Sequence, residues 1–160
     1  FTEYRVDYAL MRFHGVINEH NAAETHLTQT DVELLEDGLW YGTRSETHTA
    51  SKKGHEPRLL VRVEYETDDY HIGDLHRSFT YEPDGVEERA MRDITDGIVN
   101  ATEFVTLIDS HADDIGSISI RASRRLRIRL SDGGAEDEIT DLKQTLTDVL
   151  GSEHVSFVIE

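Results

Sequence analysis

The stretch LWYGTRSETHTASKKGHEPRLLVRVEY, residues 39–65, decides the fold, because it joins three kinds of local structure without a break. It starts as the end of a helix, continues as a polar loop, and finishes as a strand. Successive side chains of a strand point to opposite faces. In the last part of the stretch, one face carries Leu59, Val61, Val63 and Tyr65. This alternation predicts a strand over residues 59–65 that buries one face.

The loop inside this stretch is basic in a chain that is otherwise acidic. It carries Arg44, Lys52, Lys53 and Arg58, and only Glu46 and Glu56 oppose them. A loop rich in cations, anchored by a helix on one side and a half-buried strand on the other, can hold an anion in place. The stretch is therefore the first candidate for a binding site.

The length and composition indicate a single domain over residues 1–160. Hydrophobic residues make up 37% of the chain and charged residues 31%, which supports one globular core. No apolar run approaches the roughly 20 residues that cross a bilayer, and no cleavable signal is visible. The absence of cysteine excludes disulfides and thiolate metal sites and fits a cytoplasmic protein. The chain starts at Phe1, so we expect it to be a processed protein or part of a longer chain.

The net charge is the strongest compositional signal. There are 33 acidic residues against 16 basic ones, which gives −17 at pH 7, and the lysines are Lys52, Lys53 and Lys143. Acid-rich, lysine-poor surfaces resemble those of haloarchaeal proteins. Overall acidity argues against nonspecific binding of nucleic acid, but it does not exclude a local basic site.

The hydrophobic pattern along the rest of the chain predicts alternating helices and strands. We expect a helix capped by Thr28, with Val32, Leu35 and Leu39 as its buried stripe. Two further helices are expected, one capped by Asn100 and one over residues 139–150. The other expected strands cover residues 4–17, 72–81, 117–121, 126–130 and 154–159, with a polar connector at 18–26 and residues 72–81 paired with 59–65. The order predicts an α/β protein, an α+β sandwich with helices on one face of a sheet, and the ferredoxin-like arrangement is the nearest common one.

Several segments, in this order and spacing, resemble one protein family. They are FHGVIN at 13–18, LWYGT at 39–43, GHEPRLLVRVEY at 54–65 and YHIGDL at 70–75. These segments are similar to the guide-RNA-binding backbone subunit of type I-B CRISPR Cascade complexes, the Cas-seven family. The resemblance is densest between Tyr8 and Leu75.

The resemblance implies an RNA-recognition-type fold and a non-catalytic subunit without a cofactor. It also implies that identical copies polymerise along a CRISPR guide RNA, contact other Cascade subunits, and meet target DNA indirectly. Members typically open with a strand and an Asn-Gly-Asp-Pro type turn, and this sequence has no such turn. We therefore expect a C-terminal portion of the subunit, with a sheet that is incomplete on its N-terminal side.

Two groups of basic residues are candidates for RNA contacts. With the resemblance, the loop residues are expected to bind phosphates while the Gly54 backbone approaches closely; they are Arg44, Lys52, Lys53, His55 and Arg58. The alternative is a solvated loop whose charges pair with nearby acids. A second group could meet RNA, a neighbouring copy, or only the protein's own acids: Arg121, Arg124, Arg125, Arg127 and Arg129. Tyr41 is open to base stacking, whereas Trp40 is expected in the core.

Nine histidines raise an alternative function, a histidine- or metal-dependent ribonuclease of similar fold. The tightest cluster is His71, Asp74 and His76. On a strand, Asp74 and His76 share a face while His71 points away, so the three do not converge. No catalytic residue and no metal ligand is therefore assigned.

Overall fold

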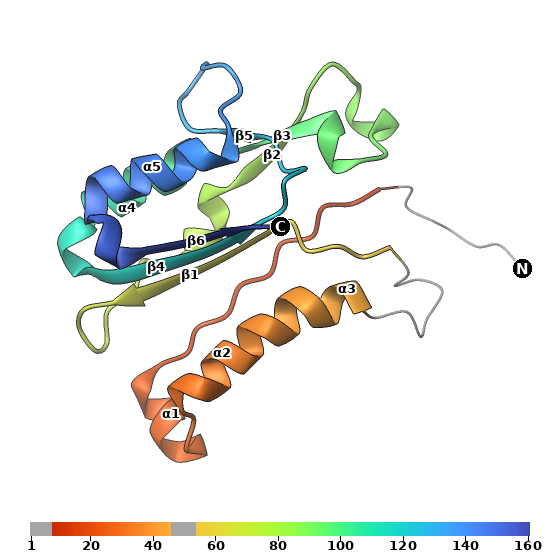
Figure 1. Cartoon of the computed structure of the whole chain (residues 1–160). Coiled ribbons are helices and arrows are strands. Elements are labelled where there is room, and N and C mark those ends of the chain that lie inside the picture. Colours follow the sequence, from red (N-terminus) through yellow and green to blue (C-terminus); the bar gives the residue numbers. More distant parts are fainter. Residues whose placement is uncertain (1–7, 46–53) are drawn as a thin grey trace, which may run out of the picture.

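The computed structural model describes residues 8–45 and 54–160 (Figure 1). The first part of the chain is helical: α1 Glu19–Thr25, α2 Gln29–Asp37, a π-helical turn Gly38–Gly42, and α3 Thr43–Ser45. The strands are β1 Leu59–Tyr65, β2 Thr80–Pro83, β3 Gly97–Asn100, β4 Ile115–Ala122, β5 Ile128–Arg129 and β6 Val155–Ile159. Two longer helices, α4 Thr102–Ser110 and α5 Ile139–Leu150, lie among them. Short 3-10 turns are Leu75–Ser78, Glu88–Ala90, Ile94–Asp96, Ala112–Asp114 and Ser152–His154.

The strands form two three-stranded sheets. Sheet A has the order β1-β4-β6, with β1 antiparallel and β6 parallel to β4. Sheet B has the order β2-β3-β5. This mixture of sheets and helices confirms the predicted α+β class. The strands expected at residues 59–65 and 154–159 are confirmed, because β1 covers residues 59–65 and β6 covers 155–159.

The core lies between sheet A and the helices α4 and α5. Ile118 and Ile120 of β4 point into it and are 1% exposed. The helices contribute their apolar stripes, and Phe104, Ile108, Leu142 and Leu146 are fully buried. Asn100 stands at the start of α4, where its side-chain oxygen accepts a hydrogen bond of 3.0 Å from the backbone N–H of Thr102. The two predicted helices therefore cover one face of the sheet, as the hydrophobic periodicity indicated.

The predicted pairing of residues 59–65 with residues 72–81 is wrong. β1 pairs with β4, with Val61 opposite Ile120. Residues Leu75–Ser78 form a 3-10 turn, and only Thr80–Pro83 is a strand, which pairs with β3 in the other sheet. Asp74 has a left-handed backbone, φ 54°, and that conformation ends any extended segment before it can run into the next residues.

The predicted N-terminal strand is also wrong over its described part. Residues 8–17 contain no strand, and residues 4–7 of that prediction lie outside the described residues. The segment instead runs along residues 76–81, where Arg12 donates a hydrogen bond of 2.7 Å to the carbonyl of Phe79. The predicted polar connector contains helix α1, which Asn18 caps by accepting a hydrogen bond from the backbone N–H of Asn21. Residues 9–17 are exposed, so the run lacks the packing against cross-strand neighbours that stabilises a strand.

Helix α2 begins as predicted but turns a different side to the protein. Thr28 and Asp31 form the expected capping box. Leu35 and Leu39, predicted as buried, are each 49% exposed, whereas Trp40 is fully buried as expected. Figure 1 shows α2 and α3 on the side of sheet A opposite α4 and α5. We call residues 29–45 the helical cover. In the described part of the chain, no helix is both long and apolar enough to cross a membrane.

Candidate nucleic-acid interface

One end of sheet A, where strands start or finish, brings together residues from both predicted basic groups. At this end β1 begins, while β4 and β6 end, because Leu59 pairs with Ala122 and Ala122 pairs with Ile159. Arg58 therefore lies beside the end of β4. The backbone N–H of Ser123 donates to the carbonyl of Arg58 at 2.9 Å, and the backbone N–H of Arg124 donates to the carbonyl of Glu160 at 2.8 Å.

The C-terminal end of the helical cover lies at this same end of sheet A. The Tyr41 hydroxyl donates a hydrogen bond of 2.8 Å to the Glu160 carboxylate, and Arg44 approaches the other oxygen of that carboxylate at 3.5 Å. The guanidinium of Arg121 lies 5.6 Å from the centre of the Tyr41 ring, within the range of a cation–π contact. We call Tyr41, Arg44, Arg58, Arg121 and Arg124 the sheet-end cluster.

The carboxylates in the sheet-end cluster are fewer than its cations. The Glu160 carboxylate interacts with both Tyr41 and Arg44. Glu56 pairs with Arg58 at 2.7 Å, and Asp37 pairs with Arg121 at 2.7 Å. Among the described residues, the Arg124 side chain has no ion-pair partner, and it is exposed. The cluster thus combines four guanidinium groups, three carboxylates and one half-exposed aromatic ring.

The pKa values reflect this network. The hydrogen bond from Tyr41, together with Arg44 and Arg121, holds the pKa of Glu160 below its usual value. The same bond raises the pKa of Tyr41, because ionising the phenol would place two anions together. Partial burial, the largest single influence, lowers the pKa of Arg121, but the hydrogen bond to Asp37 and the nearby acidic groups together raise it above its usual value. All these groups therefore stay in their ordinary charge states near neutral pH.

The remaining arginines of the second group lie elsewhere and are bound by acids. Arg125 pairs with Asp93 at 2.7 Å, and Arg129 pairs with Glu82 at 2.9 Å. Arg127 pairs with both Asp84 and Glu136, at 2.6 and 2.7 Å. Glu136 and Asp84 raise the pKa of Arg127, and Arg127 lowers that of Glu136. Of the three partners weighed from the sequence, the protein's own acids thus hold these three arginines in this structure. We call them the paired arginines.

The centre of the basic loop is not placed. Lys52 and Lys53 lie outside the described residues, so their predicted role stays a prediction. Gly54 has φ 86°, a left-handed backbone that suits glycine. His55 follows it and is partly buried. The chain then reaches Arg58 and the sheet-end cluster.

The histidines that the structure describes give no support to a ribonuclease site. His76 stacks on His14, with ring centres 4.5 Å apart, and the cluster of His71, Asp74 and His76 gives no metal-binding group among the described residues. The one such group there is Glu19, His20 and Asp69, whose ligand atoms lie within 4.8 Å of one another. His20 is 74% exposed, and nothing besides the acids marks this group as a metal site.

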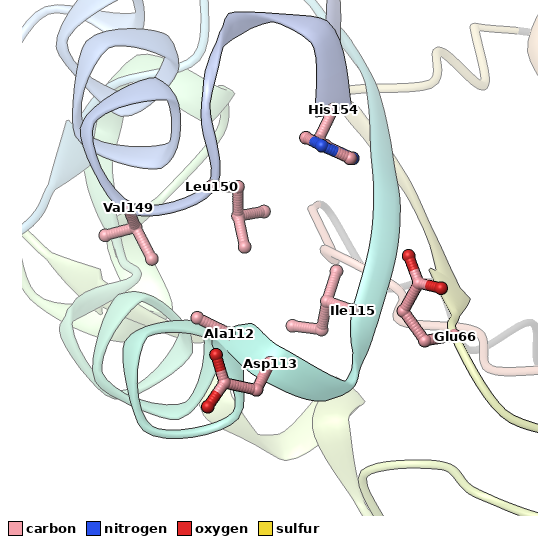
Figure 2. Close-up of a pocket in the computed structure, with 7 residues that line it drawn as sticks. All are labelled: Glu66, Ala112, Asp113, Ile115, Val149, Leu150 and His154. Carbon is pink, nitrogen blue, oxygen red and sulfur yellow. The ribbon is translucent and has the colours of Figure 1, made fainter.

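A pocket at the opposite end of sheet A contains another histidine (Figure 2). Figure 2 shows Glu66, Asp113 and His154 around a floor formed by Ile115 and Leu150. Nδ1 of His154 lies 2.6 Å from the carbonyl oxygen of Gly116, so that nitrogen carries the proton and donates it. Neither carboxylate is hydrogen-bonded to the ring among the described contacts. The Glu153 carboxylate lies 3.8 Å from Nε2 of His154, beyond hydrogen-bond distance and 73% exposed, so the described residues of this pocket give no support to the ribonuclease alternative.

Sequence reasoning missed the acids that organise the interface. Asp37 and Glu160 are distant in sequence from Arg121 and Tyr41, and no local spacing links them. Arg62 was seen only as the polar face of a strand, yet it pairs with Glu36 of the helical cover at 2.8 Å. The basic patches were visible in the sequence because their members are neighbours, whereas their partners come together only when the sheet forms.

Two comparisons with known proteins agree. The family model described as CRISPR-associated protein Cas7 matches residues 1–102. A protein of Haloferax volcanii named CRISPR-associated protein Cas7 is 35% identical over 128 residues. The matched region is 80% of this chain but only 37% of that relative. The chain therefore spans well under half the length of the relative.

Proposed function

Because this chain belongs to the Cas7 family of CRISPR-associated proteins, we propose that it binds CRISPR guide RNA as part of a non-catalytic backbone subunit. Copies of the subunit polymerise along the guide RNA in a type I-B Cascade complex. They contact other Cascade subunits and meet target DNA indirectly, in the cytoplasm of a salt-adapted cell. The part of the subunit represented here is the C-terminal portion.

The observation that supports this function most directly is the sheet-end cluster. Four arginines and a half-exposed tyrosine lie at one end of sheet A in a chain with net charge −17. Guanidinium groups bind phosphate oxygens in pairs and stack on bases, and they keep these directional contacts where an ammonium offers mainly charge. Lys52 and Lys53 lie between Arg44 and Arg58 in the sequence, and we include them in the proposed site.

Filter binding of guide RNA to the whole protein tests the assignment. We expect Arg58→Gln with Arg124→Gln to weaken binding about tenfold or more, because each substitution removes a charged hydrogen-bond donor. The matched control is Arg77→Gln with Arg89→Gln, which removes the same charge from two exposed sites. We expect that control to change affinity less than about twofold. Equal losses in both variants would show that only net charge matters and would refute the site.

The loop lysines give a second test of the same site. Lys52→Ala with Lys53→Ala is expected to weaken binding about equally for all RNA sequences, because phosphate contacts carry no sequence information. At high salt, Arg58→Lys is expected to harm binding more than Lys52→Arg, since lysine loses the planar hydrogen-bonding geometry. If the lysine variant binds guide RNA like the wild type, the loop is only solvated.

Cleavage of labelled guide RNA separates the proposal from the ribonuclease alternative. We expect no turnover, with or without divalent metal ions. Turnover that disappears in a single histidine variant, such as His154→Ala, would replace the binding function by a catalytic one.

A further inference from the structure

The outer face of sheet A, the face turned away from α4 and α5, is unusually polar for a covered surface. The strand alternation places Arg62 and Arg121 on it, since Val61, Ile120 and Ala122 point into the core. Serines occupy much of the remaining area: Ser117, Ser119 and Ser156. Sheet faces that carry a helix are normally apolar, because burial of apolar area holds the two layers together. This face has only Leu60 and Val158 for such an attachment, the two residues that pair with Arg121 on the neighbouring strands.

The helical cover lies on this face with most of its leucines toward solvent, the reverse of an ordinary amphipathic helix. Its leucines point away, and Leu34 is 69% exposed. The residues with reduced exposure recur about every fourth position, at Val32, Glu36, Trp40 and Thr43. A glutamate thus takes a place on the helix where an apolar residue would be expected. The side of the helix that meets the sheet is acidic and aromatic.

Two ion pairs join the helical cover to the outer face. Glu36 pairs with Arg62 at 2.8 Å, and Asp37 pairs with Arg121 at 2.7 Å. The Arg62 and Glu36 side chains are 25% and 13% exposed, so this pair is partly shielded from water. A second guanidinium nitrogen of Arg62 binds Glu64 at 2.9 Å, while its Nε is buried without a hydrogen-bond partner among the described residues. Both arginines therefore have carboxylates where phosphates of a nucleic acid would fit.

Trp40 is the main apolar anchor of the helical cover. It is fully buried, and it lies between Asp37, which binds Arg121, and Tyr41, which binds Glu160. Burying one large aromatic side chain contributes a few kcal/mol at most. The half-exposed Asp37–Arg121 pair contributes about 1 kcal/mol or less. For the more shielded Glu36–Arg62 pair, the cost of removing both charges from water offsets much of their attraction. The attachment of the helical cover is therefore weak relative to that of the core helices.

We propose that the outer face of sheet A is a second surface for single-stranded RNA, and that the helical cover closes it by placing Glu36 and Asp37 where phosphates would bind. RNA that reaches Arg62 and Arg121 displaces the two acids, and the helical cover lifts from the sheet. The inference rests on the proposed function, because the displacing ligand is RNA. It goes further in assigning Arg62 to RNA binding and in making the helical cover a competitor of the RNA.

The fluorescence of Trp40 reports the position of the helical cover directly, because this is the single tryptophan of the chain. Acrylamide quenching of Trp40 is measured while oligouridylate RNA is added to the whole protein. We expect quenching to rise with RNA, as the indole leaves its buried place. In Glu36→Gln with Asp37→Asn, we expect higher quenching before any RNA is added and RNA affinity about five- to tenfold higher, since the competing charges are gone.

Two variants control this experiment. Glu24→Gln with Glu33→Gln removes the same charge from exposed positions that pair with no cation among the described residues, and we expect wild-type quenching. Adding Arg62→Gln to Glu36→Gln with Asp37→Asn is expected to abolish most of the gain in affinity. RNA binding without a rise in Trp40 quenching would refute the displacement and leave the proposed function standing. An absence of RNA binding in every variant would refute both.

Discussion

The two faces of sheet A are covered in opposite ways. On the inner face, Ile118 and Ile120 pack against fully buried side chains of α4 and α5. On the outer face, Arg62 and Arg121 pair with Glu36 and Asp37 of the helical cover. The two sets of residues come from the same strands, one position apart. One face of the sheet is therefore held to its helices by hydrophobic packing, and the other face is held to its cover largely by ion pairs.

This comparison fits the proposed role. Hydrophobic burial is undirected and persists in salt, so it suits a part of the protein that stays closed. Ion pairs near the surface are weak and are readily exchanged for other ion pairs, so they suit a part that gives way to a charged ligand. The following experiments act on one face and leave the other unchanged.

Shortening a side chain of the inner face is expected to have the largest effect. Ile120→Ala removes buried methyl groups and is expected to lower the free energy of unfolding by about 2–5 kcal/mol, through lost transfer energy and a residual cavity. The matched change on the outer face is Ser119→Ala, at the preceding position of the same strand, which we expect to change stability by less than about 0.5 kcal/mol. Denaturant unfolding measures both. Similar losses for the two variants would mean that the faces do not differ.

Removing Trp40 is expected to free the helical cover and not the sheet. In Trp40→Ala, amide hydrogen exchange over residues 29–45 is expected to accelerate at least about tenfold, or roughly 1.4 kcal/mol of local stability. Exchange in β4 is expected to stay near its wild-type rate. If both regions accelerate by the same factor, the helical cover and the core unfold as one unit.

Salt is expected to affect the two faces in opposite directions. Raising KCl from about 10 mM to about 1 M shortens the screening length from about 30 Å to about 3 Å. Screening relieves repulsion among the 33 acidic residues, so the thermal midpoint is expected to rise. The same screening weakens Glu36–Arg62 and Asp37–Arg121, so acrylamide quenching of Trp40 is expected to increase. A thermal midpoint that stays flat or falls would contradict adaptation of the protein to high salt. Unchanged quenching of Trp40 would show that the ion pairs do not hold the helical cover in place.

Acid is expected to give the smallest effect. The pKa of Glu160 is lowered in the folded protein, chiefly by the hydrogen bond from Tyr41 and also by Arg44 and Arg121. Its contribution is therefore present above the ordinary value of 4.5 and is lost as the pH falls through the lowered value. Trp40 quenching is expected to rise slightly over that acid range in the wild type. Glu160→Gln should remove this part of the pH dependence, and an identical profile in both proteins would contradict it.

The sequence predicted the parts of the fold that depend on local periodicity. The apolar stripes of α4 and α5 and the alternation of β1 need no knowledge of their partners. The sequence-based prediction failed where the structure of a segment depends on which other segment it packs against. Residues 8–17 have the composition of a strand, but residues 9–17 are exposed and pack in no sheet. The buried side of the helical cover follows from Arg62 and Arg121, which lie beyond it in the chain.

The candidate site was also predicted only in part. The arginines were visible as a run without an intervening acid, but the run divides between two sheets. Arg121 and Arg124 join the sheet-end cluster, while Arg127 binds Asp84 and Glu136. Which arginines remain for a ligand depends on where acids distant in the sequence are brought by the fold, and no spacing rule contains that information.

The helical cover is the first described helical region to be synthesised after α1, and its partners Arg121 and Glu160 are made long afterwards. At about 5–20 residues per second, the ribosome needs several seconds to make the intervening chain. During that time the leucines and acids of residues 29–45 have no sheet to meet. The segment thus leaves the ribosome well before the strands on which it docks, and it docks only after β4 and β6 have been made.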